Sequence, residues 1–172
     1  MTSFTNEMTR LIKESRVSFL IENDVPSYYE INNGLCEEFA SLIGCKFSEP
    51  SMLTEFWTES LEDDEGLIDW EFLEKWGVTL PPNGLTKDEL NDVRFGGHCF
   101  LHLEGRWFDA ECPEGAVSPF ELPIFRRPIV RALRLKGIPT DDVITDDVVT
   151  PPPCKVPNPI KRNEAADLSP SP

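Results

Sequence analysis

The sequence predicts an α+β fold in which N-terminal helices pack on a small antiparallel sheet. Apolar residues recur at helical spacing over residues 4–22, and a second amphipathic stretch covers residues 32–44. The segment HCFLHLEGRWFDAE, residues 98–111, holds two aromatic and apolar runs separated by Glu104-Gly105, which is typical of a β-hairpin. A chain of 172 residues is long enough for one domain with a substantial core.

Local signals place the ends of these elements. Pro26 should end the first helix, because proline disfavours helical backbone at the residue before it. In the second helix, four apolar residues starting at Leu35 follow i, i+4, i+7, i+8 spacing, and Gly44 is a natural stop. Any of Asn32, Asn33 or Gly34 would end a preceding loop, which places Cys36 in the first helical turn.

Residues 46–97 are acidic and irregular, with two short helices expected. The first covers residues 68–76 and is closed by Gly77, and the second begins at a capping box, Thr86-x-x-Glu89. Between them, PPNG at 81–84 predicts a turn.

The segment after the hairpin, AECPEGAVSPFELPIFRRP, is rich in turn residues. Five basic residues then form an island in an acidic chain: Arg126, Arg127, Arg131, Arg134 and Lys136. We expect them to pair with the protein's own acids, and a ligand site is the alternative. Residues 1–138 are therefore assigned to the folded domain. Residues 139–172, with many proline and aspartate residues, two TDDV repeats and no aromatic residue, are assigned to a disordered or extended tail.

Charge and cysteine usage limit the classes of function. A net charge of -15 argues against nucleic-acid binding and leaves basic partners open. No apolar run is long enough for a membrane span, and the N-terminus lacks a signal-peptide core, so a cytoplasmic location is expected. The five cysteines are unpatterned, which argues against disulfides and against a zinc ribbon, and we expect neither a metal nor a cofactor.

Cys36 is the candidate nucleophile. A helix N-terminus favours the thiolate through its free N–H groups and its dipole. On a helical wheel Cys36 lies at the edge of the apolar face, and Ala40 one turn later leaves room beside the sulfur. The same placement suits a half-buried structural cysteine, which is the commoner role for this residue type.

The hairpin supplies the partners that a nucleophilic cysteine needs. With Glu104-Gly105 as the turn, His98 is directly opposite Glu111 and diagonal to Asp109. By strand alternation these three residues share one face with His102, and Cys99 points to the other. His98 is then a candidate base, and either acid is a candidate to orient it. A lone hairpin with these residues is more often structural.

The pattern Gly34-x-Cys36-x-x-Phe39-Ala40 resembles the nucleophile helix of transglutaminase-like proteins in the papain-like cysteine peptidase superfamily. His98 at the start of a strand, followed by Gly105-Arg106-Trp107 and Asp109, is similar to the second half of that motif. The resemblance covers about half of the chain and requires an insertion over much of residues 48–96. The overall sequence character of the second half also resembles small proteins of tailed bacteriophages. For such a protein the expected location would be the host cytoplasm.

The resemblance implies a papain-like core and acyl transfer from an amide. Cys36 would be the nucleophile, His98 the general base and acid, and Asp109 the orienting residue, with Glu111 as the alternative acid. The oxyanion would lie against the Cys36 N–H and one further donor, for which Asn32 and Asn33 are candidates. His102 would be structural, or it would contact the three catalytic residues without contacting the substrate.

The substrate class that follows is a peptide or protein amide. The acidic residues 55–71 could wall the cleft and favour basic substrates. The alternative is a catalytically inactive acidic protein that keeps this fold and acts as a binding or inhibitor protein. A third interpretation, a metal site built from Cys36, His98 and a carboxylate, has less support, because the sequence has no short-spaced pair of metal ligands. Oligomeric state has no signal in the sequence.

Overall fold

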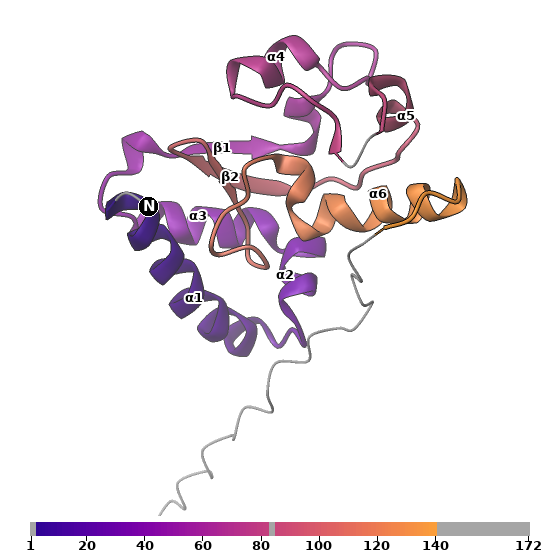
Figure 1. Ribbon diagram of the computed structural model, residues 1–172. Helices are drawn as coiled ribbons and strands as arrows, with labels where there is room; N and C mark the ends of the chain where they lie inside the picture. The colour runs from indigo at the N-terminus through magenta and orange to yellow at the C-terminus, as the bar shows by residue number, and fades with distance from the viewer. Residues whose placement is uncertain (1–2, 83–84, 141–172) are drawn as a thin grey trace, which may run out of the picture.

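The computed structural model describes residues 3–82 and 85–140, which form a mixed structure of helices around one small sheet (Figure 1). The strands are β1 (Thr54–Trp57), β2 (Cys99–Leu103) and β3 (Arg106–Phe108), in the spatial order β1-β2-β3 and antiparallel throughout. The α-helices are α1 (Ser3–Asn23), α2 (Tyr28–Gly34), α3 (Cys36–Lys46), α4 (Trp70–Lys75), α5 (Lys87–Asn91) and α6 (Pro123–Leu135).

The predicted hairpin and its register are confirmed. Leu103 pairs with Arg106 and Leu101 with Phe108, so Glu104 and Gly105 form a two-residue turn. Both turn residues have positive φ, 51° and 76°, as a tight hairpin turn of the primed type requires. This register carries the residues after β3 back alongside the residues that precede β2.

Strand alternation divides the apolar residues into two cores, one on each face of the sheet. Cys99, Leu101 and Leu103 of β2 pack with α1, α2 and α3. Phe100 of β2 and Trp107 of β3 pack instead with residues of α4, α5 and α6. Figure 1 shows α1 and α3 on one side of the sheet and α4 and α5 on the other.

The expected loop before Cys36 is wrong, because residues 28–34 form helix α2. Ser27 caps this helix: its side chain accepts the N–H of Glu30. Ile31 and Asn32 are the buried residues of the helix. The expected stop at Gly44 is also wrong, since α3 continues to Lys46. Phe47 is buried just beyond, and its N–H binds the Ile43 carbonyl, so the chain stays helical until that side chain is in the core.

Besides α2, strand β1 and helix α6 were not expected. Strand β1 is short and buries mainly Phe56, so it carries no alternation that sequence could reveal. Helix α6 lies in the segment that was read as turns, because Pro123 and Pro128 mask its periodicity. Pro123 in fact opens the helix, where its missing N–H costs nothing.

The two short helices expected between residues 68 and 89 are present. Helix α4 ends before Gly77, whose φ is 83°, and Thr86 and Glu89 form the expected capping box of α5. Asn83-Gly84 and nearly all of the expected tail lie outside the described residues. Two members of the basic island pair with acids, Arg127 with Glu111 and Lys136 with Glu89. None of the described helices combines the length and apolarity needed to cross a membrane.

Candidate active site

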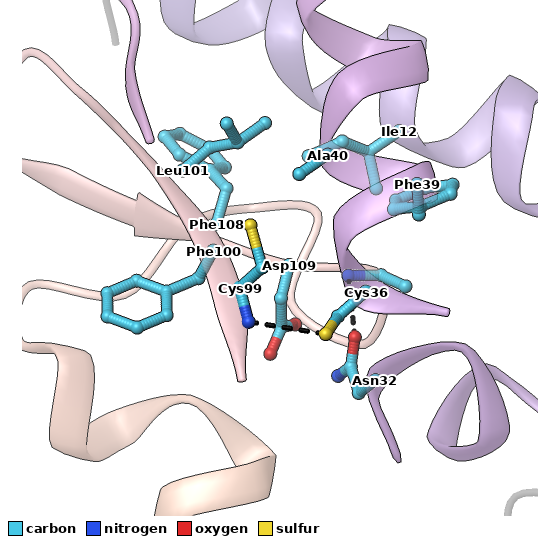
Figure 2. A pocket seen from close by; sticks show the side chains of 11 residues that line it. Ile12, Asn32, Cys36, Phe39, Ala40, Cys99, Phe100, Leu101, Phe108 and Asp109 are labelled. Atoms are coloured by element: carbon cyan, nitrogen blue, oxygen red, sulfur yellow. Dashed lines mark hydrogen bonds between the residues drawn. The ribbon is translucent and has the colours of Figure 1, made fainter. Parts of the chain in front are cut away.

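Cys36 is the first residue of α3, where two helices meet end to end. The α2 helix ends at Gly34, Leu35 leaves the helical conformation with φ of -128°, and α3 starts at once. The Cys36 Sγ accepts the backbone N–H of Cys99 at 3.3 Å, which ties the start of α3 to the start of β2 (Figure 2). The side chain is half-buried, so part of it stays open to solvent.

His98 directly precedes β2 and is fully buried. Its Nδ1 lies 3.1 Å from the main-chain carbonyl oxygen of Asn32, and its Nε2 lies 3.3 Å from Oδ2 of Asp109. A carbonyl and a carboxylate only accept hydrogen bonds. Both contacts are hydrogen bonds only when both ring nitrogens carry a proton, so this geometry favours the imidazolium form of His98.

Asp109 directly follows β3 and is held by its own turn. Its Oδ1 accepts the backbone N–H groups of Glu111 at 2.9 Å and Cys112 at 2.7 Å. This leaves Oδ2 directed at His98. The side chain is almost fully buried, so water does not compete for that contact.

The thiol and the imidazole shift each other's pKa towards the charged pair. Partial burial raises the pKa of Cys36, but hydrogen bonds from His98 and from the Cys99 N–H, together with the charge of His98, lower it overall. Burial lowers the pKa of His98, but hydrogen bonds to Asp109 and Cys36 and their negative charges raise it to about 9. Both shifts favour the charged forms, the thiolate of Cys36 and the imidazolium of His98.

Of the two candidate acids, Asp109 contacts His98 and Glu111 does not. Glu111 forms a two-point ion pair with Arg127 and accepts the side-chain amide of Asn32 at 3.0 Å. The diagonal position on the hairpin is thus the one that reaches the imidazole. The directly opposed position points to α6.

The two residues expected to bind the oxyanion, Asn32 and Asn33, differ in their hydrogen bonds to other groups. Asn32 is buried, its amide nitrogen donates to Glu111, and its Oδ1 accepts the Ala110 N–H at 3.3 Å. Its side chain is therefore occupied, contrary to the expected role. Asn33 is exposed and takes no part in these contacts.

His102 shares a face with His98 but lies at the other end of β2. It sits among aromatic rings, 4.6 Å from Trp107 and 4.8 Å from Trp76 between centroids. Its Nε2 is buried without a hydrogen-bond partner, and burial lowers the pKa of His102. It does not contact the triad.

A cavity of only about 10 Å³ lies between α3 and the sheet, beside Cys36. Ile12, Ala40, Phe39 and Leu101 are among its apolar walls, and Figure 2 shows the side chains of Cys36 and Asp109 at one end. Such a volume holds at most one water molecule. The cavity therefore has no room for a larger ligand, and Cys36 is accessible only from its exposed side.

Two acidic side chains, Glu55 and Glu37, act on the thiol of Cys99. Burial raises the pKa of Cys99, and the charges of Glu55 and Cys36, a hydrogen bond to Glu55 and the charge of Glu37 raise it further. Glu37 is exposed in the first turn of α3, and Glu55 is exposed on β1. Cys99 itself is buried in the core, as strand alternation predicts. Within residues 3–82 and 85–140, no group of three or more metal-ligating side chains could hold a metal ion.

Comparisons with protein-family models, with curated proteins and with solved structures found no match for this chain. The site must therefore be interpreted from its own geometry. Sequence reasoning named the three side chains that meet here, but it missed the Asn32 carbonyl and the Cys99 N–H. It expected Arg127 to pair with an acid, but not that this acid is Glu111. The two missed groups are backbone groups, which leave no residue signal, and Arg127 lies on a helix that was not expected.

Proposed function

We propose that the protein is a cysteine-dependent hydrolase or acyltransferase acting on amide bonds, with Cys36 as nucleophile, His98 as general acid and base, and Asp109 as the residue that orients His98. The observation that carries the proposal is the imidazole of His98, which contacts hydrogen-bond acceptors at both nitrogens while it lowers the pKa of Cys36. A core cysteine needs no such partner.

A papain-like core of the transglutaminase type fits the same residues. A cysteine at the N-terminus of a helix that packs on an antiparallel sheet, with histidine just before β2 and aspartate just after β3, supports this assignment. The chain order Cys, His, Asp is the order that the resemblance implies.

The reaction divides into two steps. The Cys36 thiolate attacks the amide carbonyl and forms a C–S bond; the C–N bond then breaks, and the leaving amine takes its proton from the His98 imidazolium. Neutral His98 next accepts a proton from water, or from an acceptor amine, as that nucleophile attacks the thioester. The C–S bond breaks, and Cys36 and His98 return to their charged forms.

Backbone N–H groups at the start of α3 are the first candidates to bind the oxyanion. The first N–H groups of a helix have no partner within it, and the N–H of Cys36 belongs to this set. The Asn32 side chain is committed to Glu111 and Ala110, so it is a poor second donor. Asn33, exposed beside it, is the remaining side-chain candidate.

Basic amides or amines are the substrates that suit the surroundings of the thiol. Glu37 and Glu55 lie close enough to Cys99 to raise its pKa, and the Cys99 N–H binds the Cys36 sulfur. A positive charge next to the scissile bond would be attracted to this face. The net charge of -15 acts in the same direction at longer range.

The test is the pH profile of iodoacetamide alkylation, with each modified residue mapped by mass spectrometry. Cys45, which is exposed near the other end of α3, serves as an internal reference. At pH 6.5 Cys36 should react about 100-fold faster than Cys45, and His98→Ala should abolish the difference. His102→Ala is the matched control and should retain it. If Cys36 reacts no faster than Cys45, the catalytic proposal fails, and an acidic binding protein becomes the better interpretation.

Acyl transfer itself needs a separate measurement. A panel of fluorogenic peptide amides with lysine or glutamate next to the scissile bond should show turnover that is lost in Cys36→Ala. An acylated Cys36 should be visible in the intact mass after rapid acid quenching. Equal rates for the two series would remove the preference for basic substrates but would leave the triad in place.

A further inference from the structure

The nitrogen of His98 that does not face Asp109 is held by a backbone group. Nδ1 lies 3.1 Å from the carbonyl oxygen of Asn32, in the last turn of α2. The last carbonyl groups of a helix have no partner within it, so this one is free to accept a hydrogen bond from the ring. Its position depends on what fixes the end of α2.

Asn32 is held by two contacts of its buried side chain. Its Oδ1 accepts the Ala110 N–H at 3.3 Å, and its Nδ2 donates to Oε2 of Glu111 at 3.0 Å. Ala110 and Glu111 directly follow the triad carboxylate in sequence. The carbonyl that binds His98 and the carboxylate that binds His98 are thus connected through one short segment.

Glu111 is in turn held by α6. Arg127 donates from both terminal nitrogens to the two carboxylate oxygens, and its guanidinium lies over the ring of Tyr29 on α2, 4.8 Å from the centroid. A two-point guanidinium–carboxylate pair fixes both direction and distance. Arg127 therefore holds α2 through a ring contact and through Glu111.

We propose that the Arg127–Glu111 pair is a positioning device for catalysis, which holds the Asn32 carbonyl against His98 so that the imidazolium form is favoured. The inference rests on the proposed function of the triad. It assigns a role to two residues that touch neither the thiol nor the imidazole. It also explains why Glu111, the directly opposed acid of the hairpin, points away from His98.

The physical basis is the second hydrogen bond of the imidazolium. A charged donor binds a carbonyl more strongly than a neutral donor does. If Asn32 moves, His98 keeps only Asp109 as an acceptor, the cation loses stabilisation, and the thiolate of Cys36 loses its counter-charge.

The test compares alkylation of Cys36 in wild type and in the double variant Glu111→Gln/Arg127→Met. The double change removes one negative and one positive charge, so net charge is constant. Asp109 and Cys99, which contact the imidazole and the Cys36 sulfur, are unchanged. Glu37 and Glu55, whose charges act on the Cys99 thiol, are unchanged as well. We expect the rate at pH 6.5 to fall about tenfold and the midpoint of the pH profile to rise by about one unit.

The matched control is Glu89→Gln/Lys136→Met, which removes the ion pair between α5 and the end of α6. It makes the same charge change, and glutamine can keep the capping box of α5. This control should alkylate as wild type does. Such a comparison separates positioning from a general loss of stability, because a merely structural pair would not move the midpoint.

Arg127→Lys is the milder second variant, since it keeps the charge and loses the two-point geometry. It decides the question if the double variant does not fold, and it should give a smaller shift in the same direction. An unchanged midpoint in a folded variant, with rapid alkylation in wild type, overturns the inference alone. Slow alkylation of Cys36 in wild type overturns the triad and the inference together.

Discussion

The two histidines of this chain lie on the same face at opposite ends of β2, and their environments have opposite effects. His98 and His102 are both buried. Both ring nitrogens of His98 meet acceptors, and its pKa rises to about 9. His102 lies among Phe56, Trp76 and Trp107 with its Nε2 unpartnered, and burial lowers its pKa.

Burial by itself therefore does not decide the charge of a histidine. Removing the ring from water disfavours the cation at both ends of the strand. At His98 two acceptors and a thiol reverse that effect, whereas at His102 the neighbouring rings provide no acceptor for Nε2. The His98 end and the His102 end of β2 differ in the polar groups that meet the ring.

The largest expected effect comes from Asp109→Asn. The side chain keeps its shape, and its Oδ1 can still accept the N–H groups of Glu111 and Cys112. Its new amide, however, is a donor that faces Nε2 of His98, so the imidazolium loses its carboxylate. Alkylation of Cys36 at pH 6.5 should fall about 10- to 100-fold.

The control for this change is Asp69→Asn, because Asp69 also accepts a backbone N–H, that of Phe72 at the start of α4. Asparagine serves equally well at a helix N-cap, and alkylation should stay at the wild-type rate. A wild-type rate in Asp109→Asn would show that the Asn32 carbonyl alone is enough to hold the cation.

A smaller effect is expected on stability when Cys36→Ser removes the thiol. In the proposed ion pair, folded wild type holds one proton on His98 between pH 6.5 and about 9. The unfolded chain holds one proton on Cys36 over the same range, so the pair adds no pH dependence. In the serine variant, His98 still has a raised pKa. Its contribution is complete below pH 6.5 and is lost as the pH rises towards 9.

The free energy of unfolding in urea should therefore fall with pH in Cys36→Ser relative to wild type, by on the order of 1 kcal/mol across this window. Cys45→Ser, at an exposed position of the same helix, should leave the wild-type profile unchanged. Parallel profiles for Cys36→Ser and wild type would mean that the folded protein holds Cys36 as a neutral thiol.

The smallest effect concerns the other end of the strand. The pKa of His102 is lowered in the folded state, so the unfolded chain binds a proton there first as the pH falls below 6.5. That proton uptake makes the folded protein less stable in acid. The variant His102→Phe should not have this destabilisation, so its free energy of unfolding relative to wild type should improve by about 1 kcal/mol between pH 6.5 and 5. Urea unfolding at pH 6.5 and at pH 5 measures the free energy of unfolding of both proteins. An equal change with pH in the two would contradict a lowered pKa of His102.

Local signals predicted those parts of the fold whose cause is local. The Glu104-Gly105 turn dictated the hairpin register, and the register predicted which residues oppose each other after β3. The capping box at Thr86 and the proline after α1 likewise act through neighbours in the chain. Prediction failed at β1, which is short and buries mainly Phe56, and at α6, where prolines hid an amphipathic face.

The sequence by itself determined that Cys36 lies in the first turn of a helix, that His98 begins a hairpin, and that Asp109 and Glu111 lie at the end of its second strand. Spacing and turn chemistry are sufficient for these, since they depend on residues close together in the chain. The tertiary structure decided that Asp109 binds His98, that Glu111 binds Arg127, and that the Asn32 carbonyl reaches the ring. Those contacts join α2, α6 and the hairpin through hydrogen bonds of fixed direction, and two of the groups are backbone atoms that every residue carries.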